Sequence, residues 1–422
     1  MKKQLIFKKF FRKLPLLLIP IAGINSLVFA QQPAGTYNVK TDGSALGNGI
    51  TDDTSAINNA MSAASAAGQD LYFPVGNYLI SNNIVVQDGV SVYGDKTGLS
   101  VICANGSLPY FGETTWGKSI DDINIEDLIF VNVRIWFKGG AYKDNYAMKR
   151  CMFIACDNAA KHKDQVAWEY IKKGSIEDSI FLRQGNCQGV ALSTYRTNDT
   201  DVRNNVWGLD LNNKDWLATE WTRFSQWNNL LGKLDTLRTS YQLDWDQGRF
   251  RAAWYPNRVI NTSCYFNIFN GSPFYDLSDG IQDHVVYSKD FTNLKIVGNW
   301  MRGWPNDPSG GLKLRNANGP GVVAANYFDN TPVLQYIYNI PGVPFSYKNI
   351  LIYRNLFFLD DNLSFNRLGA SYWETTAPEA GGDINVEYHQ NIYDCPSNLG
   401  NINISNGNPA EQKVYATNYY SG

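Results

Sequence analysis

The sequence has few of the residues that serve most enzyme sites. Its three histidines are His162, His284 and His389, and none lies near a Gly-x-Ser-x-Gly motif that would expose a catalytic serine. The six cysteines match no zinc-binding spacing, and no phosphate loop or dinucleotide-binding motif is present. Nothing in these patterns therefore points to zinc, nucleotide or serine chemistry.

Long hydrophobic runs are also scarce. After residue 30 no apolar stretch is long enough to span a bilayer. Within residues 1–30, a basic segment precedes an apolar stretch, which ends in Val28-Phe29-Ala30 with small residues at the expected cleavage positions. We therefore expect residues 1–30 to be a cleaved signal peptide. The mature chain, residues 31–422, is expected to be periplasmic or secreted, without a membrane anchor.

Positive charge is limited as well. Removal of residues 1–30 leaves 31 basic residues against 39 acidic ones. A generally basic surface, which nucleic-acid binding favours, is therefore absent. A polyanionic ligand would need a local basic cleft in an acidic body. We expect a monomer that binds no nucleic acid.

A three-residue pattern recurs along the chain, in which a small or polar residue precedes two apolar residues. It begins at Asp127, Cys151, Ser179, Asn205, Cys264, Asn299, Asn326, Asn355 and Asn391. The intervals are 24 to 36 residues, apart from one of 59. Such intervals fit the coils of a solenoid, in which each repeat is buried by its neighbours. The pattern predicts an all-β parallel β-helix as a single domain over residues 31–422, with a polar ladder at one turn.

The first coil has its own signature. Asp52-Asp53-Thr54 begins a segment with apolar residues at helical spacing, and Gly68 ends it, which predicts a capping helix. Phe73-Pro74-x-Gly76-x-Tyr78 follows. This stretch resembles the N-terminal segment of the pectate-lyase-like superfamily, which includes pectin and alginate lyases, polygalacturonases, mannuronan epimerases and phage tailspike depolymerases. The resemblance implies a right-handed parallel β-helix, but it does not fix one reaction.

A tryptophan-rich insertion at about residues 209–255 fills the 59-residue interval. Apolar residues from Leu217 to Leu237 recur at helical spacing, which predicts an amphipathic helix. The aromatic rings either pack on the side of the solenoid or, at Trp245 and Trp254, stack on the faces of sugar rings.

Basic residues gather in two segments that are one coil apart. Lys289 and Lys313 are separated by 24 residues, so we expect them on adjacent strands about 4.8 Å apart. Strand alternation places Lys313 and Arg315 on one face. His284 precedes Lys289 by five residues, and Arg302 lies in the intervening coil. The candidate substrate-binding residues are Lys313, Arg302, Tyr287, Trp254 and Trp245.

The segments Ser288-Lys289, 293–299 and Gly311-Leu-Lys-Leu-Arg315 resemble the catalytic stretch of β-helical alginate lyases and chondroitinase B. This resemblance implies β-elimination in an acidic, uronate-containing polysaccharide, with Lys289 as the base and Arg315 as its acid partner. His284 is a further candidate participant. Where that family carries two calcium-binding glutamates, this chain has Gln282 and His284. We therefore expect no cofactor, although calcium stays open, and a cation such as Lys313 would neutralise the uronate carboxylate.

Other functions also remain open. Lys289 is alternatively a solvated turn residue, and Arg315 the partner of an acid on a neighbouring coil. A glycoside hydrolase would need paired carboxylates, for which Asp279, Asp283 and Asp307 are candidates. The signatures of polygalacturonases are absent, however. A C5-epimerase would share the proton-abstraction step with a lyase, but the Asp-Pro-His motif of mannuronan epimerases is absent as well. A carbohydrate-binding β-helix would need neither base nor acid. A polysaccharide lyase is the main prediction.

Overall fold

The computed structural model describes residues 32–421 apart from several gaps. The gaps are 107, 119, 139–141, 156–163, 184–188, 209–229, 242–249, 272–283, 305–310, 338–346, 360–370, 376–383, 395–401, 404–411 and 415–417. The described residues belong to one compact unit that begins at Gln32. The predicted signal peptide and Trp245 lie outside the described residues. No helix among the described residues is long and apolar enough to cross a membrane.

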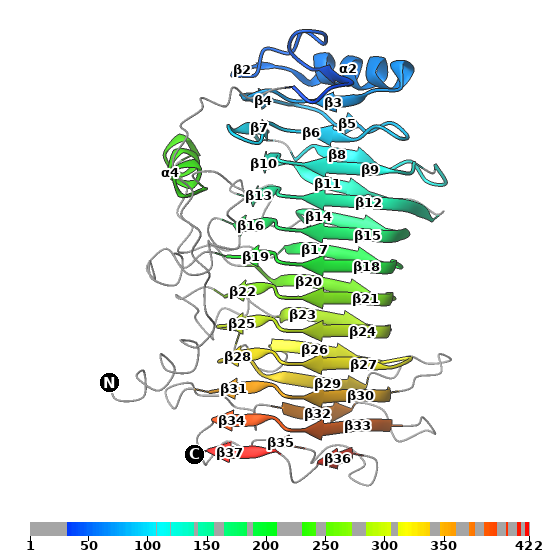
Figure 1. Ribbon diagram of the computed structural model, residues 1–422, viewed down its shortest axis with the longest axis vertical. Helices are drawn as coiled ribbons and strands as arrows, with labels where there is room; N and C mark the ends of the chain where they lie inside the picture. Colours follow the sequence, from blue (N-terminus) through cyan, green and yellow to red (C-terminus); the bar gives the residue numbers. More distant parts are fainter. Residues whose placement is uncertain are drawn as a thin grey trace, which may run out of the picture. The chain divides into compact units, whose positions relative to one another are not determined.

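Three parallel sheets build this unit, and each turn of the chain except the first and the last adds one strand to each sheet (Figure 1). Sheet A contains β1 (Thr36–Asn38), β3 (Asp70–Tyr72), β6 (Val92–Tyr93), β9 (Ile123–Glu126), β12 (Lys143–Lys149), β15 (Ile171–Glu177), β18 (Asn198–Arg203), β21 (Ile260–Tyr265), β24 (Thr292–Val297), β27 (Gly321–Ala324), β30 (Tyr347–Tyr353), β33 (Ile384–His389) and β36 (Gln412–Val414). Sheet B contains β2 (Asn48–Asp52), β4 (Gly76–Leu79), β7 (Ser100–Cys103), β10 (Ile129–Val131), β13 (Met152–Ala155), β16 (Ile180–Arg183), β19 (Val206–Trp207), β22 (Ile268–Asn270), β25 (Trp300–Arg302), β28 (Tyr327–Asp329), β31 (Leu356–Phe358), β34 (Ile392–Asp394) and β37 (Tyr419–Ser421). Sheet C contains β5 (Ile84–Val85), β8 (Tyr110–Glu113), β11 (Arg134–Phe137), β14 (Val166–Glu169), β17 (Val190–Tyr195), β20 (Ala252–Asn257), β23 (His284–Lys289), β26 (Gly311–Arg315), β29 (Val333–Ile337), β32 (Ser371–Thr375) and β35 (Ile402–Asn403). The predicted parallel β-helix is confirmed.

A ladder of buried asparagines lies at the turn from sheet A to sheet B. Its members are Asn205, Asn267, Asn299, Asn326, Asn355, Asn391 and Asn418. In each step the side-chain oxygen of one asparagine accepts from the backbone and side-chain N–H groups of the preceding one; for Asn326 and Asn299 the two distances are 2.9 and 3.0 Å. Each coil therefore satisfies the polar groups of the next.

Two residues that were predicted to belong to the polar ladder lie elsewhere in their coils. Asn267 occupies the ladder position of its coil, whereas Cys264, three residues earlier, is a buried residue of β21. Asp127 has a positive φ of 59° one residue before the ladder position, which Leu128 fills. Both residues were assigned to the ladder for the same reason: each precedes two apolar residues in the sequence, as the true ladder residues do.

The residues that follow the ladder pack a stack of aromatic rings inside the solenoid. Phe153, Phe181, Trp207 and Phe269 lie parallel, with centroids 4.9, 4.8 and 4.3 Å apart. Such offset contacts add to the hydrophobic stabilisation of the coils. The second apolar residue of the recurring pattern is therefore the core of the fold.

Two helices flank the strands among the described residues. Helix α2 (Thr54–Ala67) covers the N-terminal coil and ends at Gly68, whose φ of 65° suits a glycine, as predicted. Helix α4 (Leu230–Tyr241) belongs to the predicted insertion, and its Leu234 and Leu237 pack on the outer face of sheet B beside Ile154 and Leu182.

Candidate functional site

The outer face of sheet C is set by strand alternation. Trp254 of β20, Val286 of β23 and Leu314 of β26 point into the core. Side chains alternate along a strand, so the residues that follow Trp254 and Val286, and those on either side of Leu314, point outward. Register pairing aligns the outward residues in two columns. One column is Ser193, Tyr255, Tyr287, Lys313 and Leu334; the other is Tyr195, Asn257, Lys289, Arg315 and Tyr336. Aromatic and cationic side chains are thereby brought together from strands up to 140 residues apart in sequence.

Tyr287 is the centre of this group. Nη1 of Arg315 donates a 2.6 Å hydrogen bond to its hydroxyl oxygen. Its ring stacks on Tyr255 with the centroids 5.1 Å apart, and the His284 ring lies 4.6 Å away. The ammonium of Lys313 is 5.2 Å from the centroid of Tyr287. The phenol is thus held by four neighbours and faces two cations.

The two lysines of the cluster differ in exposure. Lys313 is only 8% exposed, and its ammonium also lies 4.4 Å from the ring centroid of Tyr336. Lys289 is half-buried at the end of β23 and is the register partner of Arg315. Lys313 is instead the register partner of Tyr287, so the predicted stacking of Lys289 on Lys313 is wrong by two residues, although both lysines lie on adjacent strands. Lys289 is the more accessible of the two amines.

Two expected contacts are not on this face, and a third is covered. Trp254 is fully buried, and its indole N–H donates to Thr194 inside the solenoid, so it cannot stack on a sugar. Arg302 ends β25 in sheet B, where its Nε lies 3.5 Å from the Asp329 carboxylate. His284 is only 3% exposed. These placements correct the expectations for Trp254 and Arg302, whereas His284 belongs to the cluster but is covered, with its ring against Tyr287.

Several residues of the face were missed from the sequence. Tyr255 and Asn257 precede the cluster by one coil, and Tyr336 follows it. The buried side-chain oxygen of Asn257 accepts no hydrogen bond from the described residues. Burial raises the pKa of Tyr255, the neighbouring Tyr287 raises it further, and Arg315 opposes the shift. Asn257 precedes Lys289 by 32 residues, the interval that separates Asn267 from Asn299, but assigning Cys264 to the ladder made this interval 35 residues.

Calcium does not fit the described part of this site. His284, at a position where a glutamate ligand is expected, is buried against Tyr287, and Lys313 and Arg315 lie on the next strand. These cations would repel a divalent ion. Among the described residues, no group of three or more His, Cys, Asp or Glu side chains could hold a metal ion. Gln282 lies outside the described residues, and we derive no step through calcium.

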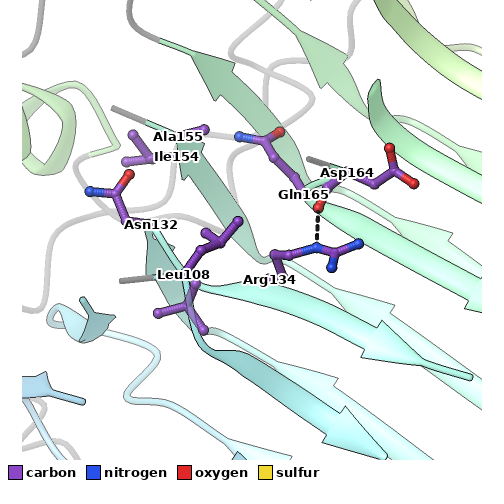
Figure 2. Close-up of a pocket in the computed structure, with 8 residues that line it drawn as sticks. Leu108, Asn132, Arg134, Ile154, Ala155, Asp164 and Gln165 are labelled. Carbon is purple, nitrogen blue, oxygen red and sulfur yellow. Dashed lines mark hydrogen bonds between the residues drawn. The ribbon is translucent and has the colours of Figure 1, made fainter. Parts of the chain in front are cut away.

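A separate open pocket of about 190 Å³ lies several coils toward the N-terminus (Figure 2). Arg134 Nε donates to the backbone oxygen of Asp164 at 2.9 Å, and Gln165 Nε2 donates to the Leu182 carbonyl at 2.8 Å. Burial lowers the pKa of Arg134 and raises that of Asp164, and the two residues oppose each other's shifts. Both hydrogen bonds are accepted by backbone carbonyls, whereas the buried Gln165 Oε1 accepts none from the described residues, and the pocket lies outside the Tyr287 cluster.

Comparisons with known proteins agree with this architecture. The family described as Rhamnogalacturonase A/epimerase, pectate lyase-like, matches residues 36–127. The mannuronan C5-epimerase AlgE1 of Azotobacter vinelandii is 32% identical over 123 residues, which are 24% of this chain and 9% of that protein. The chain spans between 7 and 17% of the length of the curated relatives it matches.

Two solved structures extend the comparison over most of the chain. The A-module of the A. vinelandii mannuronan C-5 epimerase AlgE6 has a TM-score of 0.56 at 16% identity and covers 92% of this chain and 99% of the module. PfbA, a surface adhesin of Streptococcus pneumoniae, has a TM-score of 0.54 at 13% identity, covering 85% and 84%. At these identities the likeness concerns the fold. The three sheets and these solved structures therefore show a right-handed parallel β-helix, and residues 36–127 are similar to the pectate lyase-like family.

Proposed function

We propose that the protein modifies a uronate-containing polysaccharide by abstracting the proton at C5, and that the reaction is β-elimination. The observation that carries this proposal is the cluster of Tyr287, Lys289 and Arg315 on the outer face of sheet C. The whole chain has a formal net charge of −2, so a local group of cations is not a consequence of its composition. A uronate polymer supplies the negative charges that such a face would bind.

Proton abstraction beside a carboxylate needs nearby positive charge, because it builds a dianionic intermediate. In our proposal the neutral amine of Lys289 takes the C5 proton. The released electron pair forms the C4=C5 double bond, and the bond from C4 to the glycosidic oxygen breaks. Arg315 and Lys313 stabilise the charge on the uronate carboxylate.

Tyr287 is the better proton donor to the departing oxygen. A guanidinium stays protonated in proteins, so Arg315 is a poor acid. Its 2.6 Å hydrogen bond to the phenol oxygen instead stabilises the phenolate that forms when Tyr287 gives up its proton. Lys289 gains one proton and Tyr287 loses one, and exchange with solvent restores both. Arg315 thereby changes from the acid to a positioning residue.

C5-epimerisation is a second candidate. It begins with the same proton abstraction but returns a proton to the opposite face of C5, and the glycosidic bond stays intact. The observations that favour it are the partial identity to AlgE1 and the likeness to the AlgE6 A-module, whose names describe mannuronan epimerases. Two candidate proton-transfer groups, Lys289 and Tyr287, fit this reaction as well.

The test is incubation of the purified protein with polymannuronate, polygalacturonate and hyaluronan in deuterated water. Elimination is expected to produce ultraviolet-absorbing unsaturated ends and shorter chains. Epimerisation would instead place deuterium at C5 of an intact polymer. New reducing ends without absorbance would indicate hydrolysis, and no change in any polymer would leave a binding protein, as the likeness to an adhesin allows.

A further inference from the structure

We propose that a second surface, the aromatic–cation track, binds several units of an acidic polysaccharide away from Lys289. The track follows the turns from sheet C to sheet A in the coils on the N-terminal side of Lys289. It consists of Trp116, Tyr142, Tyr170, Lys172, Tyr195, Arg196 and Arg258. The inference rests on the proposed function only in the choice of an acidic polysaccharide as the ligand.

The rings of the track form one connected group. The Tyr170 ring makes edge contacts with Trp116, Tyr142 and Tyr195 at centroid distances of 6.3, 5.7 and 6.0 Å. Trp116 is 68% exposed and Tyr142 is 39% exposed. A single exposed ring is common on protein surfaces, but a contiguous set that is left in water marks a binding surface.

Cations alternate with these rings. Arg196 lies 5.3 and 5.2 Å from the ring centroids of Tyr170 and Tyr195, and its Nη1 donates to the Tyr170 hydroxyl at 2.6 Å. The Lys172 ammonium lies 4.7 Å from the centroid of Tyr142. Neither Lys172 nor Arg196 forms an ion pair with a carboxylate among the described residues. These two cations are therefore held in place without an ion-pair partner, whereas Nε of Arg258 lies 3.8 Å from the Asp290 carboxylate.

The track leads to the proposed reaction centre. The backbone N–H of Tyr170 donates to Tyr195, that of Arg196 to Asn257, and that of Arg258 to Lys289, at 2.9, 2.9 and 2.7 Å. These steps cross three strand spacings, or about 14 Å. A polymer lying along the solenoid axis could therefore contact the track and Lys289 at the same time.

The chemistry of the track suits an acidic sugar chain. The apolar face of a pyranose ring packs on an aromatic ring, and a guanidinium binds a carboxylate through two hydrogen bonds. A neutral polysaccharide would use the rings alone. We therefore expect the track to bind acidic polymers more tightly than neutral ones and long chains more tightly than short oligomers.

The backbone allows variants that remove charge without strain. Arg196 and Arg258 have φ angles of 53° and 57°, and asparagine tolerates this region well, so R196N and R258N remove the cation without straining the turn. Arg354 provides the matched control. It is exposed, has a φ of 55° and lies at the turn from sheet A to sheet B, so R354N makes the same change away from the track. W116A tests the most exposed ring.

Binding to polymannuronate, polygalacturonate and hyaluronan is measured by affinity electrophoresis, with dextran as a neutral polymer and short oligomers of each acid. R196N, R258N and W116A are each expected to weaken binding of at least one long acidic polymer by about tenfold, while R354N binds as the wild type does. Equal binding by all four variants, or no binding of any acidic polymer by the wild type, would overturn the inference.

The same variants separate the track from the reaction centre. If the track variants weaken binding but the wild type changes no polymer chemically, the proposed function fails and the track stands. If the wild type changes a polymer chemically but the track variants bind it unaltered, the proposed function stands and the track fails.

Discussion

Arg315 reaches diagonally across the β23–β26 pair to Tyr287, with 2.6 Å between Nη1 and the phenol oxygen. The register partner of Arg315 is Lys289, two residues farther along β23. One guanidinium therefore lies beside the amine and is bonded to the phenol. This relationship joins an amine, a phenol and a guanidinium in one group on the outer face of sheet C.

We expect Y287F to remove the proton donor while the ring contacts with Tyr255 and His284 persist. Loss of a general acid typically costs between about 10² and 10⁴ in rate. The measurement is kcat on the polymer that the wild type modifies, with polymer affinity as the control. Because phenylalanine keeps the ring, the affinity for the polymer should change little. A Y287F variant with wild-type kcat would show that Tyr287 is not the proton donor.

Lys289 can be tested as a base apart from its charge. K289M removes both the charge and the amine, whereas K289R keeps the charge but cannot become neutral at ordinary pH. We expect both variants to lose at least about 10² in kcat, because general-base catalysis contributes that much. Solvent exchange at C5 measures the step directly. Recovery of activity in K289R would show that position 289 supplies only positive charge.

The regular part of the fold was predictable from the sequence because it repeats. The coil lengths and the asparagine ladder follow from the stacking of equivalent repeats, and Gly68 ends helix α2 because glycine adopts the left-handed conformation. Cys264 shows where the repeated sequence pattern no longer identifies the ladder residue. It lies three residues before Asn267, and both precede apolar pairs, so only the stacking of the coils distinguishes them.

The site was less predictable, since it depends on the face that each residue occupies. Trp254 and Tyr255 are neighbours in the sequence, yet one is fully buried and the other is on the outer face. An error of one residue in the assigned inward and outward alternation of the strand would exchange the buried and the outward-facing residue. Arg302 was expected near Lys289, but the intervening coil carries it to sheet B. The resemblance to β-helical alginate lyases named Lys289 and Arg315, which are register partners, whereas the spacing alone pointed to Lys313 as the partner of Lys289.

Asn326 tests the contribution of the ladder to stability. Its amide donates to the Ile296 carbonyl and to Asn355, and its oxygen accepts from Asn299. N326A would leave these buried groups without partners, at about 1–3 kcal/mol for each. Urea unfolding is expected to show a loss of at least about 2 kcal/mol.

The control is N293G, in the exposed row of asparagines that joins Asn293 to Asn261. Asn293 has a φ of 52°, which glycine adopts without strain, and the Asn261 side-chain oxygen that loses its donor can bond to water instead. Only a small change in unfolding free energy is expected. Equal losses of unfolding free energy in N326A and N293G would show that the buried asparagine ladder stabilises the fold no more than the exposed row does.

Lys143 presents a different stability question, because it is a fully buried cation. Its ammonium has no hydrogen-bond acceptor among the described residues. Burial lowers the pKa of Lys143, and the nearby Glu113 and Glu169 offset this only in part. The folded protein therefore binds fewer protons than the unfolded chain between the lowered pKa and the ordinary value of about 10.4, so stability should rise with pH in that window.

K143M should remove that rise and stabilise the protein at neutral pH by about 1 kcal/mol or more, since an apolar side chain of similar length replaces a desolvated charge. Glu113 keeps its ion pair with Lys118 at 2.6 Å, so the substitution does not leave that carboxylate alone. Urea unfolding at about pH 7 and about pH 10 gives the comparison, with K295M as a control because Lys295 is exposed on β24. A destabilised K143M at both pH values would show instead that the attraction of Lys143 to Glu113 and Glu169 outweighs its desolvation.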